Sequence, residues 1–119
     1  MNYIKNANYI IVLFLVTILM FSCNQPQPKV GKDTSFYVRG NCGMCKERIE
    51  KSLTKKDGII KSYWDVKTKN LTVTYDSTKI DEGKIQQIVA NVGHETKMVI
   101  SPQAVYDALP ECCKKTGTM

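Results

Sequence analysis

The sequence of 119 residues has few of the side chains that most often carry out catalysis. It contains one histidine, no Gly-rich phosphate-binding loop and no nucleophile placed with a candidate base. It also lacks a run of about 20 apolar residues, the length that a membrane-spanning helix needs. Basic residues give a net charge of +6, but they are spread along the chain rather than clustered. The sequence therefore predicts no catalytic residues, and we do not expect an enzyme.

The N-terminal segment has the pattern of an export signal. A polar head with Lys5 precedes an almost wholly apolar stretch at 9–21, and the small residue Ser22 follows. A basic head, a short apolar run and a small residue are typical of a secretory signal peptide. We expect residues 1–22 to be removed, which leaves 97 residues with a net charge of +5; an uncleaved anchor helix is the alternative. After export, nucleic acid is not an expected partner.

A lipid-attachment signal is predicted where the apolar run ends. Met20-Phe21-Ser22-Cys23 resembles a bacterial lipobox, although that motif prefers Leu at the first of these positions and a smaller residue at the second. An unpaired cysteine at the end of a signal peptide would otherwise be unusual in an exported protein. We expect acyl chains on Cys23 to hold the protein at a membrane surface, facing the periplasm or the cell exterior. Residues 23–32 would then form the lipidated cysteine and a flexible, Pro-containing tether.

Apolar periodicity predicts a compact domain over residues 33–101. The expected elements are strands at 34–38, 60–66, 71–75 and 96–100, and helices at 45–53 and 81–92. The order strand, helix, strand, strand, helix, strand is the ferredoxin-like α+β arrangement, with two helices on one face of a four-stranded antiparallel sheet. Residues 102–119 follow as a short helix, expected at 103–109, and a tail that contains two adjacent cysteines.

A pair of cysteines lies between the first expected strand and the first expected helix. In Cys42-Gly43-Met44-Cys45 the two sulfurs converge when the first cysteine lies in a loop and the second opens a helix. A helix N-terminus lowers the pKa of a thiol, so the thiolate that metals require is available near neutral pH. Thiolates are soft ligands that select Cu(I), Zn(II) and similar ions. Taken alone, the motif also suits a redox pair or a structural disulfide.

The position of this motif in the chain resembles that of the heavy-metal-associated domain family, which includes copper chaperones and periplasmic mercury-binding proteins. The resemblance covers about residues 34–100, and the matching stretches are 41–46, 57–59, 71–76 and 92–96. It implies that Cys42 and Cys45 are metal ligands, with Cu(I) as the leading ion and Hg(II) or Zn(II) as alternatives.

The sequence departs from this family at the loop. The family usually has methionine two residues before the first cysteine, where this chain has Gly40, and Met44 stands between the cysteines instead. We therefore expect a looser loop. The main rival is a thioredoxin-type redox protein, which typically has tryptophan beside the motif, but Trp64 lies far along the chain.

Three further residues are candidate ligands. If the second helix runs back toward the loop, His94 lies beside the cysteine pair, either as a ligand or supporting donor or as an exposed turn residue. The C-terminal segment is long enough to bring Cys112 and Cys113 to the same end of the domain. There they could complete a three- or four-thiolate site; the alternatives are a disulfide between them or separate metal binding.

These features predict an envelope lipoprotein that sequesters or relays copper. Its expected partners are the metal ion, the membrane through the lipid anchor, and a metal-transporting or metal-accepting envelope protein. Mercury or zinc binding is the alternative of the same class. A membrane-tethered thiol–disulfide oxidoreductase is the alternative of a different class.

Overall fold

The computed structural model describes residues 10–12, 14 and 31–114. Almost all of the predicted signal peptide, the predicted lipidation site Cys23 and the last five residues lie outside this part of the chain. Among the residues that are described, no helix has the length and apolar character needed to cross a membrane.

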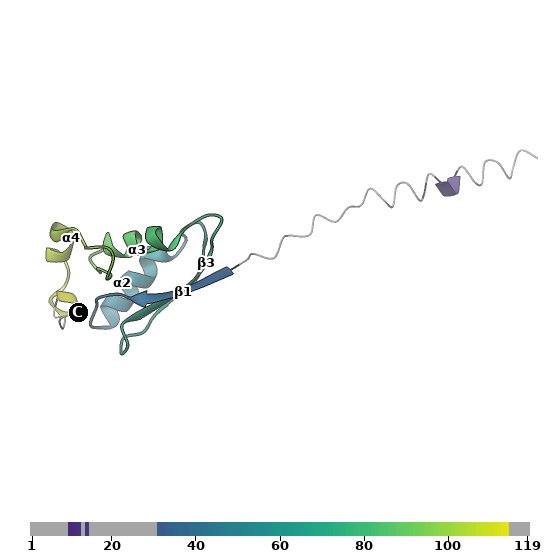
Figure 1. The fold of residues 1–119 in the computed structure, drawn as a ribbon. Coiled ribbons are helices and arrows are strands. Elements are labelled where there is room, and N and C mark those ends of the chain that lie inside the picture. The colour runs from purple at the N-terminus through teal and green to yellow at the C-terminus, as the bar shows by residue number, and fades with distance from the viewer. Residues whose placement is uncertain (1–9, 13, 15–30, 115–119) are drawn as a thin grey trace, which may run out of the picture.

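Three antiparallel strands form the sheet, in the order β1-β3-β2 (Figure 1). They are β1 (Gly31–Tyr37), β2 (Ile59–Trp64) and β3 (Asn70–Asp76). Alternate side chains of the central strand β3 point to the same face, and Leu71, Val73 and Tyr75 are buried there as their spacing predicts.

Two helices pack against this buried face. Helix α2 (Gly43–Leu53) buries Cys45, Ile49 and Leu53, which recur at helical spacing along one stripe. Helix α3 (Glu82–Ala90) begins after Asp81, whose carboxylate accepts a hydrogen bond from the Lys84 N–H at 2.7 Å. The two helices and the sheet enclose one hydrophobic core, so the predicted ferredoxin-like α+β arrangement is confirmed.

The described sheet has three strands where four were expected. Of the predicted strand at 96–100, only Thr96 pairs with the sheet, through a single bridge to Val38. The Thr96 hydroxyl accepts hydrogen bonds from the N–H groups of Met98 and Val99, and the Thr96 N–H donates to the Val99 carbonyl at 2.9 Å. These local bonds fold the segment into a turn and remove backbone groups from the sheet. Met98, in the middle of this segment, is 80% exposed.

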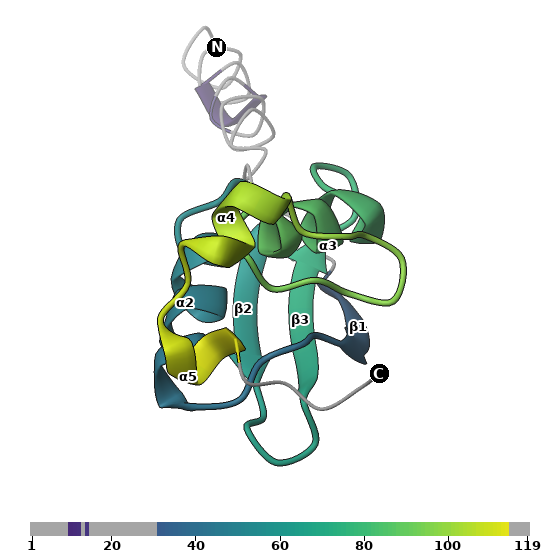
Figure 2. The same ribbon diagram turned by 90° about the vertical axis from the view of Figure 1, so that its left-hand side faces the viewer.

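The C-terminal arm, defined here as residues 102–114, lies over one end of the domain. The single helix expected at 103–109 is shorter, α4 (Gln103–Asp107), and a second short helix that was not predicted follows Pro110, α5 (Glu111–Lys114). Figure 2 shows α5 beside the start of α2. The arm therefore does not trail from the domain but returns to the loop that carries Cys42.

Candidate metal centre

Four cysteine sulfurs meet at one end of the domain. The Sγ atom of Cys42 lies 3.5 Å from that of Cys45, 2.9 Å from that of Cys112 and 3.9 Å from that of Cys113. The sulfurs of Cys45 and Cys113 are 2.7 Å apart, and those of Cys112 and Cys113 are 3.9 Å apart. All four cysteines are free thiols. The loop pair and the arm pair are separated by about seventy positions in sequence and are brought together by the fold.

Cys42 is the cysteine whose pKa its surroundings lower toward neutral pH. It has extended backbone dihedrals immediately before α2 and remains half-buried. Burial acts to raise its pKa, but the Cys112 thiol and the backbone amides of Cys45 and Met44 outweigh that effect and lower the pKa to about 7. The start of a helix is where backbone N–H groups have no partner within the helix, so they favour a negative charge there. Cys42 is therefore substantially ionised at neutral pH.

Cys45 is fully buried in the first turn of α2, and its sulfur accepts a hydrogen bond from the Asn41 N–H at 3.3 Å. The floor of the loop beneath it is Trp64, whose indole N–H donates to the carbonyls of Val38 and Lys69 at 3.2 Å. A Cβ atom at Gly40 would lie only 2.8 Å from the Trp64 ring. The indole therefore occupies the space that a side chain at position 40 would need. Trp64 is a supporting residue that the sequence patterns did not reveal.

The surroundings of the arm pair, Cys112 and Cys113, raise their pKa values, in contrast to that of Cys42. Burial, and then the neighbouring Cys45 thiol, raise the pKa of Cys113, which is 1% exposed. The hydrogen bond with Cys42 raises the pKa of Cys112. Cys112 is half-buried and also contacts the Met44 thioether at 3.7 Å, at the outer side of the cluster. In the free protein the arm cysteines are thus protonated partners of the loop thiols.

His94 lies next to the buried half of the cluster. One of its ring nitrogens and the sulfurs of Cys45 and Cys113 all lie within 4.8 Å of one another. The ring is 1% exposed, which excludes the exposed-turn interpretation, and burial lowers its pKa. Its Nδ1 lies 2.9 Å from the Arg39 carbonyl, which only accepts, so Nδ1 carries the proton of the neutral ring. Nε2 is then left with a free lone pair, and it has no hydrogen-bond partner among the described residues.

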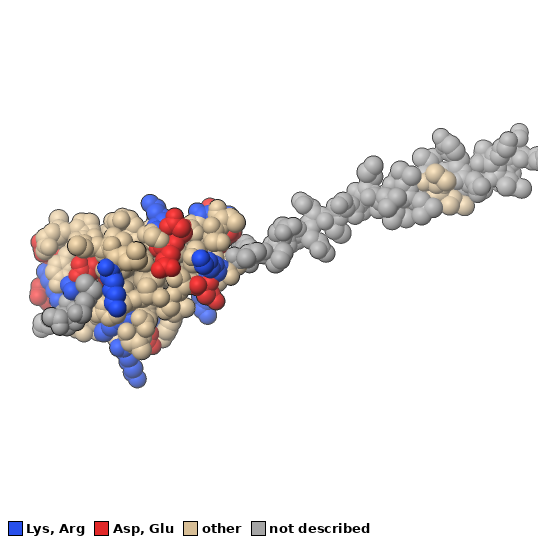
Figure 3. Space-filling model, viewed as in Figure 1, with Lys and Arg blue, Asp and Glu red and all other residues tan. Residues whose placement is uncertain are grey.

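An ion pair fixes the turn that carries His94 to the loop. The Arg39 guanidinium pairs with the Glu95 carboxylate, and the Arg39 N–H donates to the Glu95 carbonyl at 2.9 Å. Elsewhere, charges of both signs are interspersed on the face shown in Figure 3. The Arg39–Glu95 ion pair and the backbone hydrogen bond beside it hold the His94 turn against the loop.

The geometry of the sulfurs suits a metal ion. An ion bound tetrahedrally with metal–sulfur bonds of about 2.3 Å places its sulfurs about 3.8 Å apart, whereas a linear pair lies about 4.6 Å apart. Three of the measured separations, 3.5, 3.9 and 3.9 Å, are close to a tetrahedral edge. The donor set thus fits a soft ion held by more than two thiolates.

The comparisons with known proteins agree with this chemistry. Residues 36–95, half of the chain, match the family model of the heavy-metal-associated domain. A Zinc-transporting ATPase of Synechocystis sp. is 39% identical over 54 residues; the match covers 45% of this chain but only 8% of that protein.

Solved structures share the fold. The CopZ metallochaperone is 23% identical with a TM-score of 0.53, over 55% of this chain and 98% of that one. The N-terminal soluble domains of Bacillus subtilis CopA are 25% identical with a TM-score of 0.55, over 59% of this chain and 48% of that one.

Proposed function

The chain belongs to the heavy-metal-associated domain family, a family of metal-binding domains, and from this we propose that it sequesters or transfers a soft metal ion in the cell envelope through Cys42 and Cys45. The observation that supports this most directly is the pair of loop sulfurs 3.5 Å apart at the start of α2. Since the pKa of Cys42 is lowered to about 7, one ligand is ready in its metal-binding form near neutral pH. Binding and transfer require only such exchangeable thiolates.

Cu(I) is the leading ion. It is a soft cation that thiolates select, and the solved structures with this fold include proteins named for copper. Zn(II) is a second candidate, supported by the zinc-transporting relative at 39% identity and by the number of sulfurs at the site. Hg(II) is a third, because it also binds pairs of thiolates.

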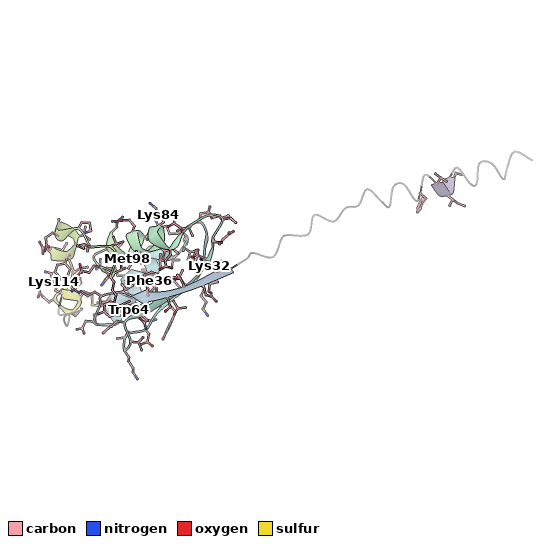
Figure 4. All side chains as sticks on the ribbon, in the orientation of Figure 1. Lys32, Phe36, Trp64, Lys84, Met98 and Lys114 are labelled. Atoms are coloured by element: carbon pink, nitrogen blue, oxygen red, sulfur yellow. The ribbon has the colours of Figure 1, made fainter. Side chains whose placement is uncertain are left out.

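We further propose that the protein acts from a membrane surface, anchored through Cys23. The described domain begins at Gly31, and Lys32 lies at the opposite end of the domain from Lys114, which follows the arm cysteines (Figure 4). An anchor on the N-terminal side would then leave the sulfur cluster facing away from the membrane. A metal-transporting or metal-accepting envelope protein could reach it there.

The test is a titration of the reduced protein with Cu(I) under anaerobic conditions, in competition with a chromophoric Cu(I) chelator. We expect tight binding of one ion per chain. The double variant Cys42→Ser/Cys45→Ser should lose it, because both proposed loop ligands are removed. The control is Met44→Leu, which removes the exposed thioether between them and should leave binding intact. Equal binding by the double variant would refute the proposal.

An oxidoreductase remains the alternative of another class, and the same preparation can test it. Turnover in an insulin-reduction assay with a thiol reductant, lost in Cys42→Ser/Cys45→Ser, would favour that function over metal transfer. We expect no turnover above the background rate, because each loop sulfur already contacts an arm sulfur, Cys42 with Cys112 and Cys45 with Cys113.

A further inference from the structure

We propose that Cys112 and Cys113 of the C-terminal arm are ligands of the same ion that Cys42 and Cys45 bind, so that a single ion is enclosed by four sulfurs. This inference rests on the proposed function, because it adds ligands to a site that the loop pair defines. The additional ligands would come from the C-terminal arm, which lies outside the region that matches the family, because that region ends at residue 95.

The distances between loop and arm sulfurs support a shared ion rather than two separate sites. Each arm sulfur lies within 3 Å of a loop sulfur, Cys112 of Cys42 and Cys113 of Cys45. An ion bound by the arm pair alone would therefore lie within bonding reach of the loop pair as well. The two shortest separations need to open by only about 1 Å to reach the edge of a tetrahedron around one ion.

Adjacent cysteines often chelate poorly because their side chains diverge, but the short helix α5 removes this obstacle. In its helical backbone the sulfurs of Cys112 and Cys113 are 3.9 Å apart, and both point toward α2. A disulfide between them would need a separation of about 2 Å. The structure thus favours a chelating pair over a vicinal disulfide.

The arm is held against the domain by contacts that involve no sulfur. Leu109 is 4% exposed and packs on Gly93, where φ is +99° and any Cβ atom would collide with the leucine side chain. The Tyr106 hydroxyl donates to the Lys114 carbonyl at 3.0 Å, which ties α4 to the end of α5. These contacts place the arm cysteines at the loop before any ion arrives, so little ordering entropy is lost on binding.

Burial divides the four sulfurs into an inner and an outer pair, and this division suggests how an ion leaves. Cys45 and Cys113 are buried, whereas Cys42 and Cys112 are half-exposed. An incoming thiolate from a partner reaches the outer pair first and replaces Cys112, the ligand on the shorter and less embedded element. The arm therefore slows release until a partner supplies a competing thiolate.

The experiment compares the reduced full chain with Cys112→Ser/Cys113→Ser, using Cu(I) and, separately, Zn(II) as probes. We expect one ion per chain in both proteins, but an affinity lower in the variant by on the order of 100-fold or more, since even the loss of a group that only supports a ligand costs about 10–100-fold. X-ray absorption should count four sulfurs on Zn(II) and three or more on Cu(I) in the unmodified chain. It should count two on either ion in the variant. The control Glu111→Gln changes an exposed neighbour of Cys112 and should leave both readouts unchanged.

The outcomes separate this inference from the proposed function. If Cys42→Ser/Cys45→Ser still binds as tightly as the unmodified chain, the proposed function fails. If the arm variant retains the full affinity and sulfur count, only the shared site fails. Two ions in the unmodified chain and one in the arm variant would show that the arm binds separately, which also overturns the inference. Circular dichroism checks the fold, and the single change Cys112→Ser, at a half-exposed position, provides the same test if the double variant does not fold.

Discussion

The loop pair and the arm pair contain the same chemical groups at one site, yet the fold treats them in opposite ways. Cys42 and Cys45 lie at the start of an eleven-residue helix, where the pKa of Cys42 falls to about 7. Cys112 and Cys113 lie on a four-residue helix, and both of their pKa values are raised. The contact with Cys112 and the backbone amides at the start of α2 lower the pKa of Cys42, whereas burial and the neighbouring sulfurs raise the pKa values of the arm thiols. The arm pair, whose pKa values are raised, is brought to the site by tertiary packing.

The largest expected effect comes from detaching the arm without altering a sulfur. Leu109→Ala removes the side chain that packs on Gly93, and truncation of a buried leucine costs about 2–5 kcal/mol. We expect the arm to detach and Cys113 to become as accessible as Cys112. Site-resolved alkylation followed by mass spectrometry measures this. Ile100→Ala, at a side chain that is 81% exposed, is the matched control and should leave Cys113 protected. Unchanged protection in Leu109→Ala would show that the sulfurs alone hold the arm.

A smaller effect is expected from the loop side. Gly40→Ala places a methyl group 2.8 Å from the buried Trp64 ring, so the ring or the loop must shift, and such overpacking costs about 1–3 kcal/mol. Gly43→Ala meets no atom within 4 Å and should change stability by less than about 0.5 kcal/mol. Chemical unfolding followed by circular dichroism compares the two. Equal stability of both variants would mean that the loop does not depend on the indole beneath it.

The smallest expected effect separates the outer thiols by their pKa values. With a pKa of about 7, Cys42 is half thiolate at pH 7, so its alkylation rate in the metal-free protein should rise through pH 7 and level off above it. The raised pKa of Cys112 postpones the same rise to higher pH. A lower pKa also makes a thiolate less nucleophilic, which offsets part of the difference, so the advantage of Cys42 at pH 7 should be at least roughly 5-fold. Rates of iodoacetamide labelling from pH 5.5 to about 9.5 test this, and a midpoint for Cys42 near that of an ordinary thiol would contradict it.

Most of the domain could be predicted from the sequence because its signals are local. The alternation of Leu71, Val73 and Tyr75 and the helical spacing of Cys45, Ile49 and Leu53 each identify a buried face without reference to the rest of the chain. The segment at 96–100 was also predicted as a strand, but it ends in three successive apolar residues and has no clear alternation. In the structure the Thr96 hydroxyl accepts hydrogen bonds from two backbone N–H groups and so folds the segment into a turn. A pattern of apolar residues does not reveal that these local bonds replace pairing with the sheet.

The site could be predicted only in part. The spacing of Cys42 and Cys45 indicates a converging pair, and chain length indicates that the arm can reach it. Sequence alone could not place α5, because a four-residue helix has almost no periodicity. It also could not decide whether Cys112 and Cys113 form a disulfide, a separate metal site or a cluster with the loop pair. The burial of His94 was also open, since it depends on contacts with Arg39 that are distant in sequence.

The packing of Trp64 beneath the loop has an optical consequence. It is the one tryptophan in the chain, a Cβ atom at Gly40 would lie only 2.8 Å from its ring, and the side chain is fully buried. Heavy ions quench indole emission at short range, so filling of the sulfur cluster should dim an intrinsic fluorophore that needs no label. The fluorescence intensity of Trp64 would then report how much of the protein holds a metal ion, and it could be followed while the ion passes from one protein to another.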